Sequence, residues 1–338
     1  MDLHLIWFIL LGVLLTGYAI LDGFDLGVGA LHLFARTDRE RRLMLNSIGP
    51  VWDGNEVWLV TGGGALFAAF PDVYATLASG FYLAVYLLIF CLIFRAVAIE
   101  FRSKRPGAFW RRSWDVAFCV SSILSAFLFG VVIGNLIWGV PLGADKEFHG
   151  TFLGLLNPYA LLTGLTVVAV CMMHGSIYVV MKTQGDFHDR VRDWVRNSII
   201  FFVIMYVTLT MATLLYVPHM VQNFKDYPLL FIIPIANLLL IANIPREIYH
   251  KKDFLAFLSS CGAMAILMFL FGFGIFPDLV LSNPHPEFSL NIYQDSSSLA
   301  TLHIMLIIAM IGMPLVVAYT VSIYWIFRGK VSIDDHSY

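Results

Sequence analysis

Residues 49–67 read GPVWDGNEVWLVTGGGALF, a stretch with the composition of a membrane-spanning helix that nevertheless carries two acids, Asp53 and Glu56. An ionised carboxylate at the centre of a bilayer costs roughly 2.5 to 3.5 kcal/mol on insertion scales, so an acid inside a span normally has a partner or a function. The membrane setting and the partners of these two acids must come from the rest of the chain.

The composition is that of a membrane protein. Of the 338 residues, 59% are hydrophobic and 13% are charged, and the mean hydropathy is +0.80, outside the balance of soluble domains. The formal net charge of -2 provides no overall basic surface for nucleic acid. The four cysteines stand in apolar runs without close pairs, which argues against a disulfide framework and a thiolate metal site. We therefore expect an all-α integral membrane protein without a soluble domain.

Nine membrane-spanning helices fit the hydropathy, because about 20 apolar residues cross a hydrocarbon core of roughly 30 Å. Prolines such as Pro71 and Pro277 follow predicted helices and support the breaks. The first helix has no basic residue before it and no small-residue cleavage pattern after it, so we expect it to be retained. The helices are predicted near residues 5–33, 51–70, 75–100, 113–138, 157–181, 198–217, 227–245, 254–276 and 301–327.

The basic residues predict the orientation of these helices. If the odd-numbered connections and the C-terminal tail face the cytoplasm, they hold 19 of the 21 Lys and Arg residues, leaving Lys146 and Lys225 outside. The positive-inside rule then puts the N-terminus outside and the C-terminus in the cytoplasm. The 19 residues are Arg36, Arg39, Arg41, Arg42, Arg95, Arg102, Lys104, Arg105, Arg111, Arg112, Lys182, Arg190, Arg192, Arg196, Arg246, Lys251, Lys252, Arg328 and Lys330.

Two pairs of acids lie in the first two predicted helices. Asp22 and Asp25 are three residues apart and share one helix face, as do Asp53 and Glu56. Because the two helices run in opposite directions, both pairs fall at comparable depth in the cytoplasmic half of the membrane. Acids at that depth can take protons from the inner water and pass them deeper.

A structural role is the alternative for each acid. Asp22 could cap a local break at Gly23, and Asp53 could cap the second helix and form a capping box with Glu56. Capping does not require acids on both helices at one depth, however. The four acids together therefore favour a proton route.

Glycines recur along the same two helices. Small residues allow helix backbones to approach closely within a membrane. The run Gly62-Gly63-Gly64 lacks the Lys-Ser/Thr of a phosphate-binding loop and the spacing of a dinucleotide fingerprint. We therefore expect close helix packing at Gly23, Gly27, Gly29, Gly54 and the run 62–64.

Histidines raise the question of haem. His174 and His303 lie clearly within predicted spans, but at depths too different for both to ligate one iron. A single axial histidine remains an alternative, since one proximal histidine can hold a haem. No other His, Cys or carboxylate cluster has the spacing of a metal site.

Several motifs together resemble subunit II of the cytochrome bd quinol oxidases, specifically in the first half of the chain and more weakly to its end. The resemblance implies nine transmembrane helices built as two four-helix bundles plus one peripheral helix, in a prokaryotic inner (plasma) membrane. The motifs are GYAILDGFDLGVG (17–29), RRLMLNSIGPVWDGNEVWLVTGGGALFAAFP (41–71), FRSK (101–104), GNLIWGVP (134–141), LLNPYALLTG (155–164) and DSSSLATLHIM (295–305).

The resemblance also implies a heterodimer with a related subunit I, with or without a small accessory subunit. Subunit I would carry haem b, haem d and the quinol site, leaving this chain without haem. The complex of that family oxidises membrane quinol, reduces O2 to water and takes the protons from the cytoplasm.

Site residues follow from the same resemblance, position by position. Asp53 matches the acid of the WDGN motif and Asp25 the second acid of the DGFD motif, and both are attributed to the proton route. Glu100 stands before the RSK segment, where the family usually has Asp. Glu56 stands where the family has Gln or Glu, so it is permitted there without being essential.

A proton-coupled secondary transporter is the alternative from another functional class. It would have acids and broken helices near the midplane between repeats. No internal repeat is visible, and the predicted acids lie toward the cytoplasmic side. The oxidase subunit is therefore favoured.

Overall fold

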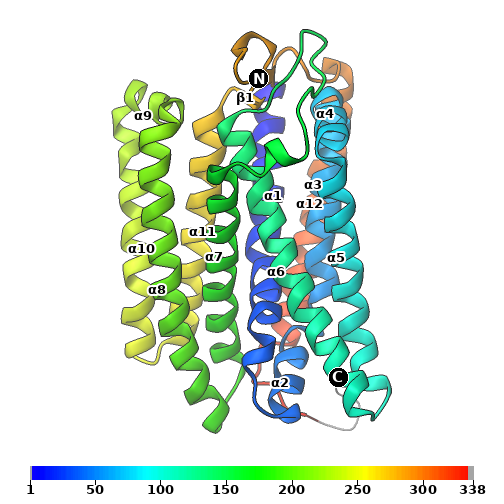
Figure 1. Ribbon diagram of the computed structural model, residues 1–338, viewed down its shortest axis with the longest axis vertical. Helices are drawn as coiled ribbons and strands as arrows, with labels where there is room; N and C mark the ends of the chain where they lie inside the picture. Colours follow the sequence, from blue (N-terminus) through cyan, green and yellow to red (C-terminus); the bar gives the residue numbers. More distant parts are fainter. Residues whose placement is uncertain (1, 334–338) are drawn as a thin grey trace.

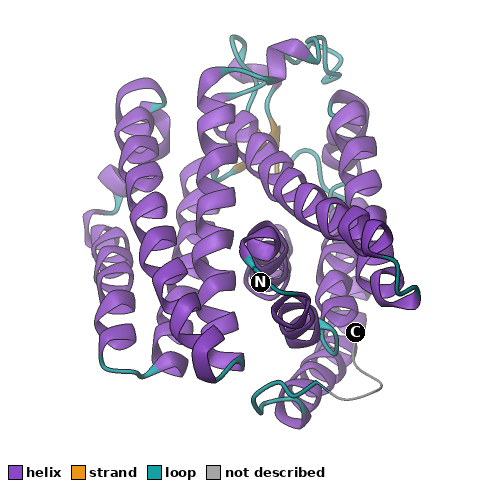
Figure 2. Cartoon of the chain, turned by 60° about the horizontal axis from the view of Figure 1, so that its bottom comes forward, coloured by secondary structure: helices purple, strands orange, loops and turns teal. Residues whose placement is uncertain are grey.

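The computed structural model describes residues 2–333, which are almost entirely helical (Figure 1). Strands are confined to one small antiparallel pair, β1 (Asp278–Val280) and β2 (Leu290–Asn291), in the described part of the chain (Figure 2). The helices are α1 (Leu3–Leu31), α2 (Asp38–Ile48), α3 (Trp52–Ala69), α4 (Pro71–Gly80), α5 (Tyr82–Phe101), α6 (Ala108–Trp138), α7 (Pro158–Lys182), α8 (Gly185–Tyr216), α9 (Gln222–Asp226), α10 (Ile232–Tyr249), α11 (Asp253–Ile275) and α12 (Leu299–Ile326). Short 3-10 turns are η1 (His32–Phe34), η2 (Arg102–Lys104), η3 (Leu153–Leu155), η4 (Pro218–Val221), η5 (Pro228–Phe231) and η6 (Pro286–Phe288).

Long apolar helices run along the longest axis of the molecule (Figure 1). Within residues 2–333, eight of them are individually long and apolar enough to cross a membrane: α1, α5, α6, α7, α8, α10, α11 and α12. The shorter α3 passes the same test together with α4, from which it is bent by 119°. Counting that bent pair as one span gives nine spans, the number predicted from hydropathy.

The main departures from the predicted helices are one division, one extension and one additional helix. The predicted helix 75–100 is divided at Phe81 between α4 and α5, and α4 begins with Pro71, whose ring favours the first position of a helix. α8 begins at Gly185 rather than near 198, because a polar and basic segment extends it beyond its apolar part. α2 was not predicted; Thr37 and Glu40 form a capping box at its N-terminus.

Packing divides the long helices into two groups. α1 packs against α3 and α6, and α5 packs against α6, while α7 packs against α8 and α10 against α11. The two groups meet where α7 packs against α6 and α1, and where α11 packs against α1. α12 touches α1 and α3 from outside, and its apolar stretch is only 6% buried. This arrangement agrees with two four-helix bundles and one peripheral helix.

Glycine makes the closest of these helix contacts possible. A Cβ on Gly27 of α1 would lie 1.8 Å from the carbonyl oxygen of Cys171 on α7, and one on Gly29 would lie 2.0 Å from Oγ of Ser122 on α6. The close packing predicted for α1 is therefore confirmed. The prediction of close packing is wrong for Gly63 and Gly64 of α3, where a Cβ would meet nothing within 4 Å.

The two ends of the bundle differ in chemistry. The end that carries α2, η2 and the start of α8, at the bottom of Figure 1, holds most of the arginines and is called the basic end below. The opposite end carries α4, α9, the β-strands and the long connections 139–157 and 276–298, and is called the loop end.

Contacts at the loop end join the first and last parts of the chain. The indole Nε1 of Trp7 on α1 donates to the carbonyl of Leu302 on α12 at 2.9 Å. Backbone N of Ser297 donates to the carbonyl of Ala69 at the end of α3 at 2.8 Å. Lys146 forms an ion pair with the buried Asp295. The connection before α12 is thus fastened to α1, α3 and the connection after α6.

Candidate functional site

A buried group of polar residues lies where α1, α3 and α5 pack together. We call it the acid cluster, and it consists of Asp22, Asp25, Asn55, Glu56 and Arg95. Asp22, Asp25 and Arg95 have no solvent exposure, and Asn55 is buried as well. Burying several charged groups in an apolar bundle is costly unless they are paired and hydrogen-bonded, so their contacts decide what they can do.

The capping alternatives for these acids are wrong. α1 continues without a break from Leu3 to Leu31, so Asp22 caps nothing at Gly23. The N-cap of α3 is Val51, which makes no side-chain capping bond, so Asp53 and Glu56 do not form a capping box. A role for these acids other than helix capping must therefore be sought in their contacts.

Arg95 is the counter-ion of the cluster. Its Nη1 donates to Oδ2 of Asp22 at 2.8 Å, its Nη2 also pairs with Oδ1 of Asp22, and Nη2 donates to Oε1 of Glu56 at 2.7 Å. The assignment of Arg95 to a cytoplasmic connection is therefore wrong, because it lies inside α5, six residues before the helix ends at Phe101. A lone arginine in an apolar helix is itself the signal of such a partner, since an unpaired charge would not be tolerated there.

Asp25 has a different environment. Its Oδ2 accepts from Nδ2 of Asn55 at 2.7 Å, and its Oδ1 is buried without a hydrogen-bond partner in the described part of the chain. The same amide of Asn55 donates to the carbonyl of Leu21, and its Oδ1 accepts from Tyr324 of α12 at 2.9 Å. Asn55 therefore joins α1, α3 and α12 at the carboxyl group of Asp25.

The other two predicted acids flank the cluster. Asp53 is exposed in the first turn of α3, two residues before Asn55. Glu100 is half-buried near the end of α5, about 7.5 Å along the helix axis from Arg95. The structure thus brings Asp25 and Glu56 into one cluster, with Asp53 and Glu100 between that cluster and the basic end.

A second cluster of charged residues lies at the basic end. Oδ1 of Asp115 on α6 lies 2.6 Å from Nε2 of His32 and 2.5 Å from Nε of Arg102, and its Oδ2 accepts from Arg41 at 2.9 Å. Arg102 also reaches Asp38 at 2.8 Å. These contacts join η1, α2, η2 and α6, so the cluster fastens the bundle. No local pattern in the sequence predicts this cluster, because its members come from four distant segments.

Glu40 of α2 makes a related tie. The backbone N of Arg36 donates to its Oε2 at 2.8 Å, and Arg190 of α8 donates to its Oε1 at 2.5 Å. Burial works against ionisation, but these donors outweigh it and lower the pKa of Glu40 below its usual value. Glu40 is therefore an ionised link between α2 and α8.

His174, the first candidate for an axial haem ligand, is fully buried on α7. Its Nδ1 lies 2.7 Å from Oγ of Ser260, and its Nε2 lies 3.0 Å from the carbonyl of Ile20. Both ring nitrogens are thus engaged, and the ring does not fit the role of an iron ligand. His303 is exposed on α12. Residues 2–333 contain no group of three or more His, Cys, Asp or Glu that could hold a metal ion.

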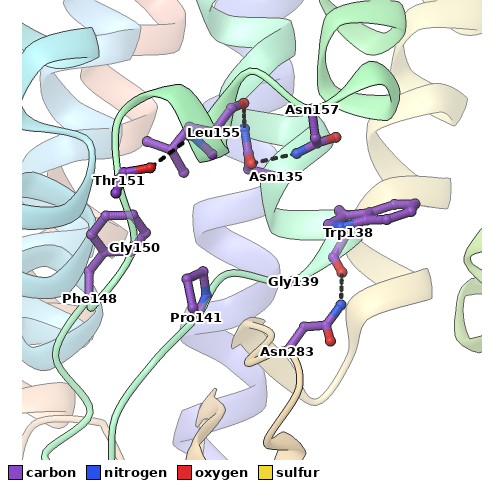
Figure 3. Close-up of a pocket in the computed structure, with 11 residues that line it drawn as sticks. Asn135, Trp138, Gly139, Pro141, Phe148, Gly150, Thr151, Leu155, Asn157 and Asn283 are labelled. Atoms are coloured by element: carbon purple, nitrogen blue, oxygen red, sulfur yellow. Dashed lines mark hydrogen bonds between the residues drawn. The ribbon is translucent and has the colours of Figure 1, made fainter.

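A pocket of about 240 Å³ lies at the loop end, where two of the sequence motifs meet (Figure 3). Nδ2 of Asn135 donates to the carbonyl of Leu155 at 2.8 Å, and Oδ1 of Asn135 accepts from Asn157 at 3.0 Å. Oδ1 of Asn157 accepts from backbone N of Ala160 and caps α7. These amides satisfy one another, so we interpret them as a fastening between α6 and α7. The acid cluster, nearer the basic end, is the better candidate for chemistry.

Comparison with known proteins decides the family. The model of the family described as "Cytochrome bd terminal oxidase subunit II" matches residues 3–327 of this chain. This chain belongs to the cytochrome bd terminal oxidase subunit II family.

Two relatives show how far the likeness extends. The chain is 35% identical to cytochrome bd-I ubiquinol oxidase subunit 2 of Escherichia coli (strain K12), over 98% of this chain and 96% of that protein. It is also 35% identical to cytochrome bd ubiquinol oxidase subunit 2 of Bacillus subtilis (strain 168), over 98% and 97% of the two chains.

A solved structure shares the fold. A chain of the bd oxidase from Geobacillus thermodenitrificans superposes with a TM-score of 0.79 at 17% identity, covering 97% of this chain and 98% of that one. Subunit II is thus a multi-span membrane protein of a haem-associated terminal oxidase complex, in which it works with subunit I in respiratory electron transport. Family membership also decides against the secondary transporter.

Proposed function

We propose that this chain is the haem-free subunit of a quinol:O2 oxidoreductase in a prokaryotic inner membrane. It supports a subunit I that carries haem b, haem d and the quinol site, and it lines a proton path from the cytoplasm. The curated relatives are named as ubiquinol oxidase subunits, which supports quinol as the electron donor. The engagement of both nitrogens of His174 supports haem sites on the partner.

The proton path runs from Asp53 toward Asp25. Asp53 is exposed near the basic end, and Asn55, two residues later, is hydrogen-bonded to Asp25. Glu56 lies one turn after Asp53 and belongs to the acid cluster through Arg95, while Glu100 offers a further carboxyl between the cluster and the basic end. The observation that carries this proposal is the fully buried Asp25, joined by one amide to a helix that begins with an exposed acid.

The partner covers the face formed by α3 and α12. α12 is almost unburied, with Leu315 and Trp325 both exposed, and Tyr319 of α12 lies against Gly54 beside Asp53. An ionised Asp53 facing lipid would be expensive. Covering this face with subunit I takes Asp53 away from lipid and directs the path into the complex.

The orientation has the basic end in the cytoplasm. Most of the arginines, including Arg41 and Arg102, lie at that end, as the positive-inside rule requires. A tag at the C-terminus should be inaccessible from outside intact cells and become accessible after lysis. Labelling of the tag on intact cells contradicts this orientation.

The test of the proton path is the variant Asp53→Asn in the intact complex. We expect O2 reduction to slow by roughly 10² or more, the range for loss of a positioned proton-transfer group, while haem content stays normal. Asp186→Asn is the matched control, because Asp186 is an exposed acid in the first turn of α8 at the same end. Equal turnover in the Asp53 variant and the control excludes Asp53 from the path.

A further inference from the structure

The single cation of the acid cluster is shared unequally among three carboxyl groups. Arg95 contacts both oxygens of Asp22 and one oxygen of Glu56, but no contact joins it to Asp25. Asp25 receives one neutral amide donor, and its second oxygen has no hydrogen-bond partner among residues 2–333. The three acids therefore differ in what stabilises their negative charge.

Charge balance limits how many of these acids can be ionised together. One guanidinium offsets one carboxylate fully, and the side chain of Glu56 is 24% exposed, so solvent also helps to stabilise its charge. A third carboxylate, on Asp25, would add a fully buried negative charge that no cation of residues 2–333 contacts directly. Low-dielectric surroundings penalise such a charge, whereas a proton on the unpartnered Oδ1 of Asp25 removes it.

We propose that Arg95 is a positioning residue that keeps Asp22 and Glu56 ionised, so that Asp25 alone takes up and releases the transferred proton in this cluster. The proton binds Oδ1 of Asp25 to give the neutral acid and leaves again to restore the carboxylate, while Oδ2 stays held by Asn55. Asp22 is then a fixed charge, and Glu56 borders the path without carrying the proton.

This inference rests on the proposed proton path and assigns separate roles within it. The charges and titratable groups that act on Asp25 come from its own helix and from four others packed around it. They are Asp22 of α1, Glu56 of α3, Arg95 of α5, Tyr178 of α7 and Tyr324 of α12.

Infrared difference spectra of the intact oxidase, oxidised against reduced, identify the carboxyl group that changes protonation. We expect one protonated-carboxyl band that is absent in Asp25→Asn and retained in Asp22→Asn and in Glu56→Gln. A band lost in either of the latter two variants, with Asp25→Asn unaffected, overturns the assignment.

Turnover with paired substitutions tests the role of Arg95. Arg95→Gln leaves Asp22 and Glu56 without their cation, so we expect O2 reduction to fall about tenfold or more. The double variant Asp22→Asn/Arg95→Gln removes both charges and should recover to within about threefold of the unsubstituted enzyme, and Arg95→Lys should retain the infrared band. A double variant as slow as Arg95→Gln alone overturns the proposal.

Arg102→Gln/Asp115→Asn is the matched control, a buried Arg–Asp pair outside the acid cluster. It should leave both the infrared band and the turnover of assembled complex unchanged, and loss of the band in this control would also overturn the proposal. If the Arg95→Gln complex does not assemble, the double variant and Arg95→Lys still test the role of Arg95. Unimpaired turnover in Asp25→Asn contradicts the proton path itself, whereas a slow Asp25→Asn combined with an equally slow Asp22→Asn contradicts only the division of roles.

Discussion

Nδ2 of Asn55 on α3 lies 2.7 Å from Oδ2 of Asp25 on α1, and no other side chain donates to that carboxyl group within the described chain. Asn55 in turn accepts from Tyr324 of α12 at 2.9 Å. One amide thus connects the peripheral helix α12 to a fully buried acid. The position of α12 and the environment of Asp25 are therefore coupled through a single side chain.

Substitution of Asn55 tests this coupling. Asn55→Ala removes the donor to Asp25, so we expect O2 reduction by the intact complex to fall by roughly tenfold at normal haem content, because the carboxylate loses a hydrogen bond of about 1.5–3 kcal/mol. Tyr324→Phe removes only the bond to Asn55 and should have a smaller effect. Equal turnover in both variants and the unsubstituted enzyme would show that the amide does not act on Asp25.

Gly27 should tolerate no side chain. A Cβ there would lie 1.8 Å from a backbone carbonyl of α7, which cannot move aside as a side chain can, so Gly27→Ala should destabilise the subunit by about 3 kcal/mol or prevent assembly. Gly12→Ala on the same helix meets nothing within 4 Å and should be neutral or stabilising by up to about 1 kcal/mol. Thermal unfolding of the purified complex measures both, and a stable Gly27→Ala complex would refute the close α1–α7 contact.

Asp278 of β1 should make the loop end sensitive to pH. Burial, with a contribution from the nearby Asp295, raises its pKa from 3.8 to about 6. Between pH 4 and 6 the folded chain therefore binds more protons than the unfolded chain, and stability falls as pH rises through this window. Across this window the free energy of unfolding falls by about 1 kcal/mol, once the partial exposure of Asp278 is allowed for.

The variant Asp278→Asn isolates this contribution. It should abolish that part of the pH dependence and raise the melting temperature at pH 7.5, where the native carboxylate is least favourable. Asp72→Asn, at an exposed acid of α4 at the same end, should leave the dependence as it was. Identical pH profiles for Asp278→Asn and the unsubstituted complex would rule Asp278 out.

His174 should prove structural. His174→Gln should keep the haem absorbance of the complex unchanged while lowering stability by about 1–3 kcal/mol, because the buried Ser260 and the carbonyl of Ile20 lose well-placed partners. Ser260→Ala removes one of these bonds and should lower stability less. Loss of a haem band in His174→Gln, with the band intact in Ser260→Ala, would identify His174 as a ligand.

Hydropathy was sufficient for the membrane helices because the required length of about 20 apolar residues is set by the bilayer itself. It was insufficient where a helix continues outside the hydrocarbon. The extension of α8 back to Gly185 and the amphipathic α2 both carry polar residues that a hydropathy scale counts as connection. Capping residues, as at Thr37, carry the missing information.

The acid cluster could be predicted only in part. Spacing along one helix indicated that Asp22 and Asp25 share a face, and the opposite directions of two helices indicated a common depth. Arg95 was missed because a basic residue near the end of an apolar run was counted with the following connection. Its partner on α1 lies 73 residues earlier in the chain, and no local pattern reveals a pair of that separation.

The hydrogen bond from Trp7 to Leu302 spans 295 residues, so it has a consequence for the order of events during synthesis. Ser297 likewise reaches back to the end of α3. Neither bond can form until nearly the whole chain has been made, and contacts of such separation form late in folding. A nascent chain halted before α12 therefore retains an open seam beside α1 and α3, the helices that carry the buried acids. Only the addition of the last helix, α12, closes that seam.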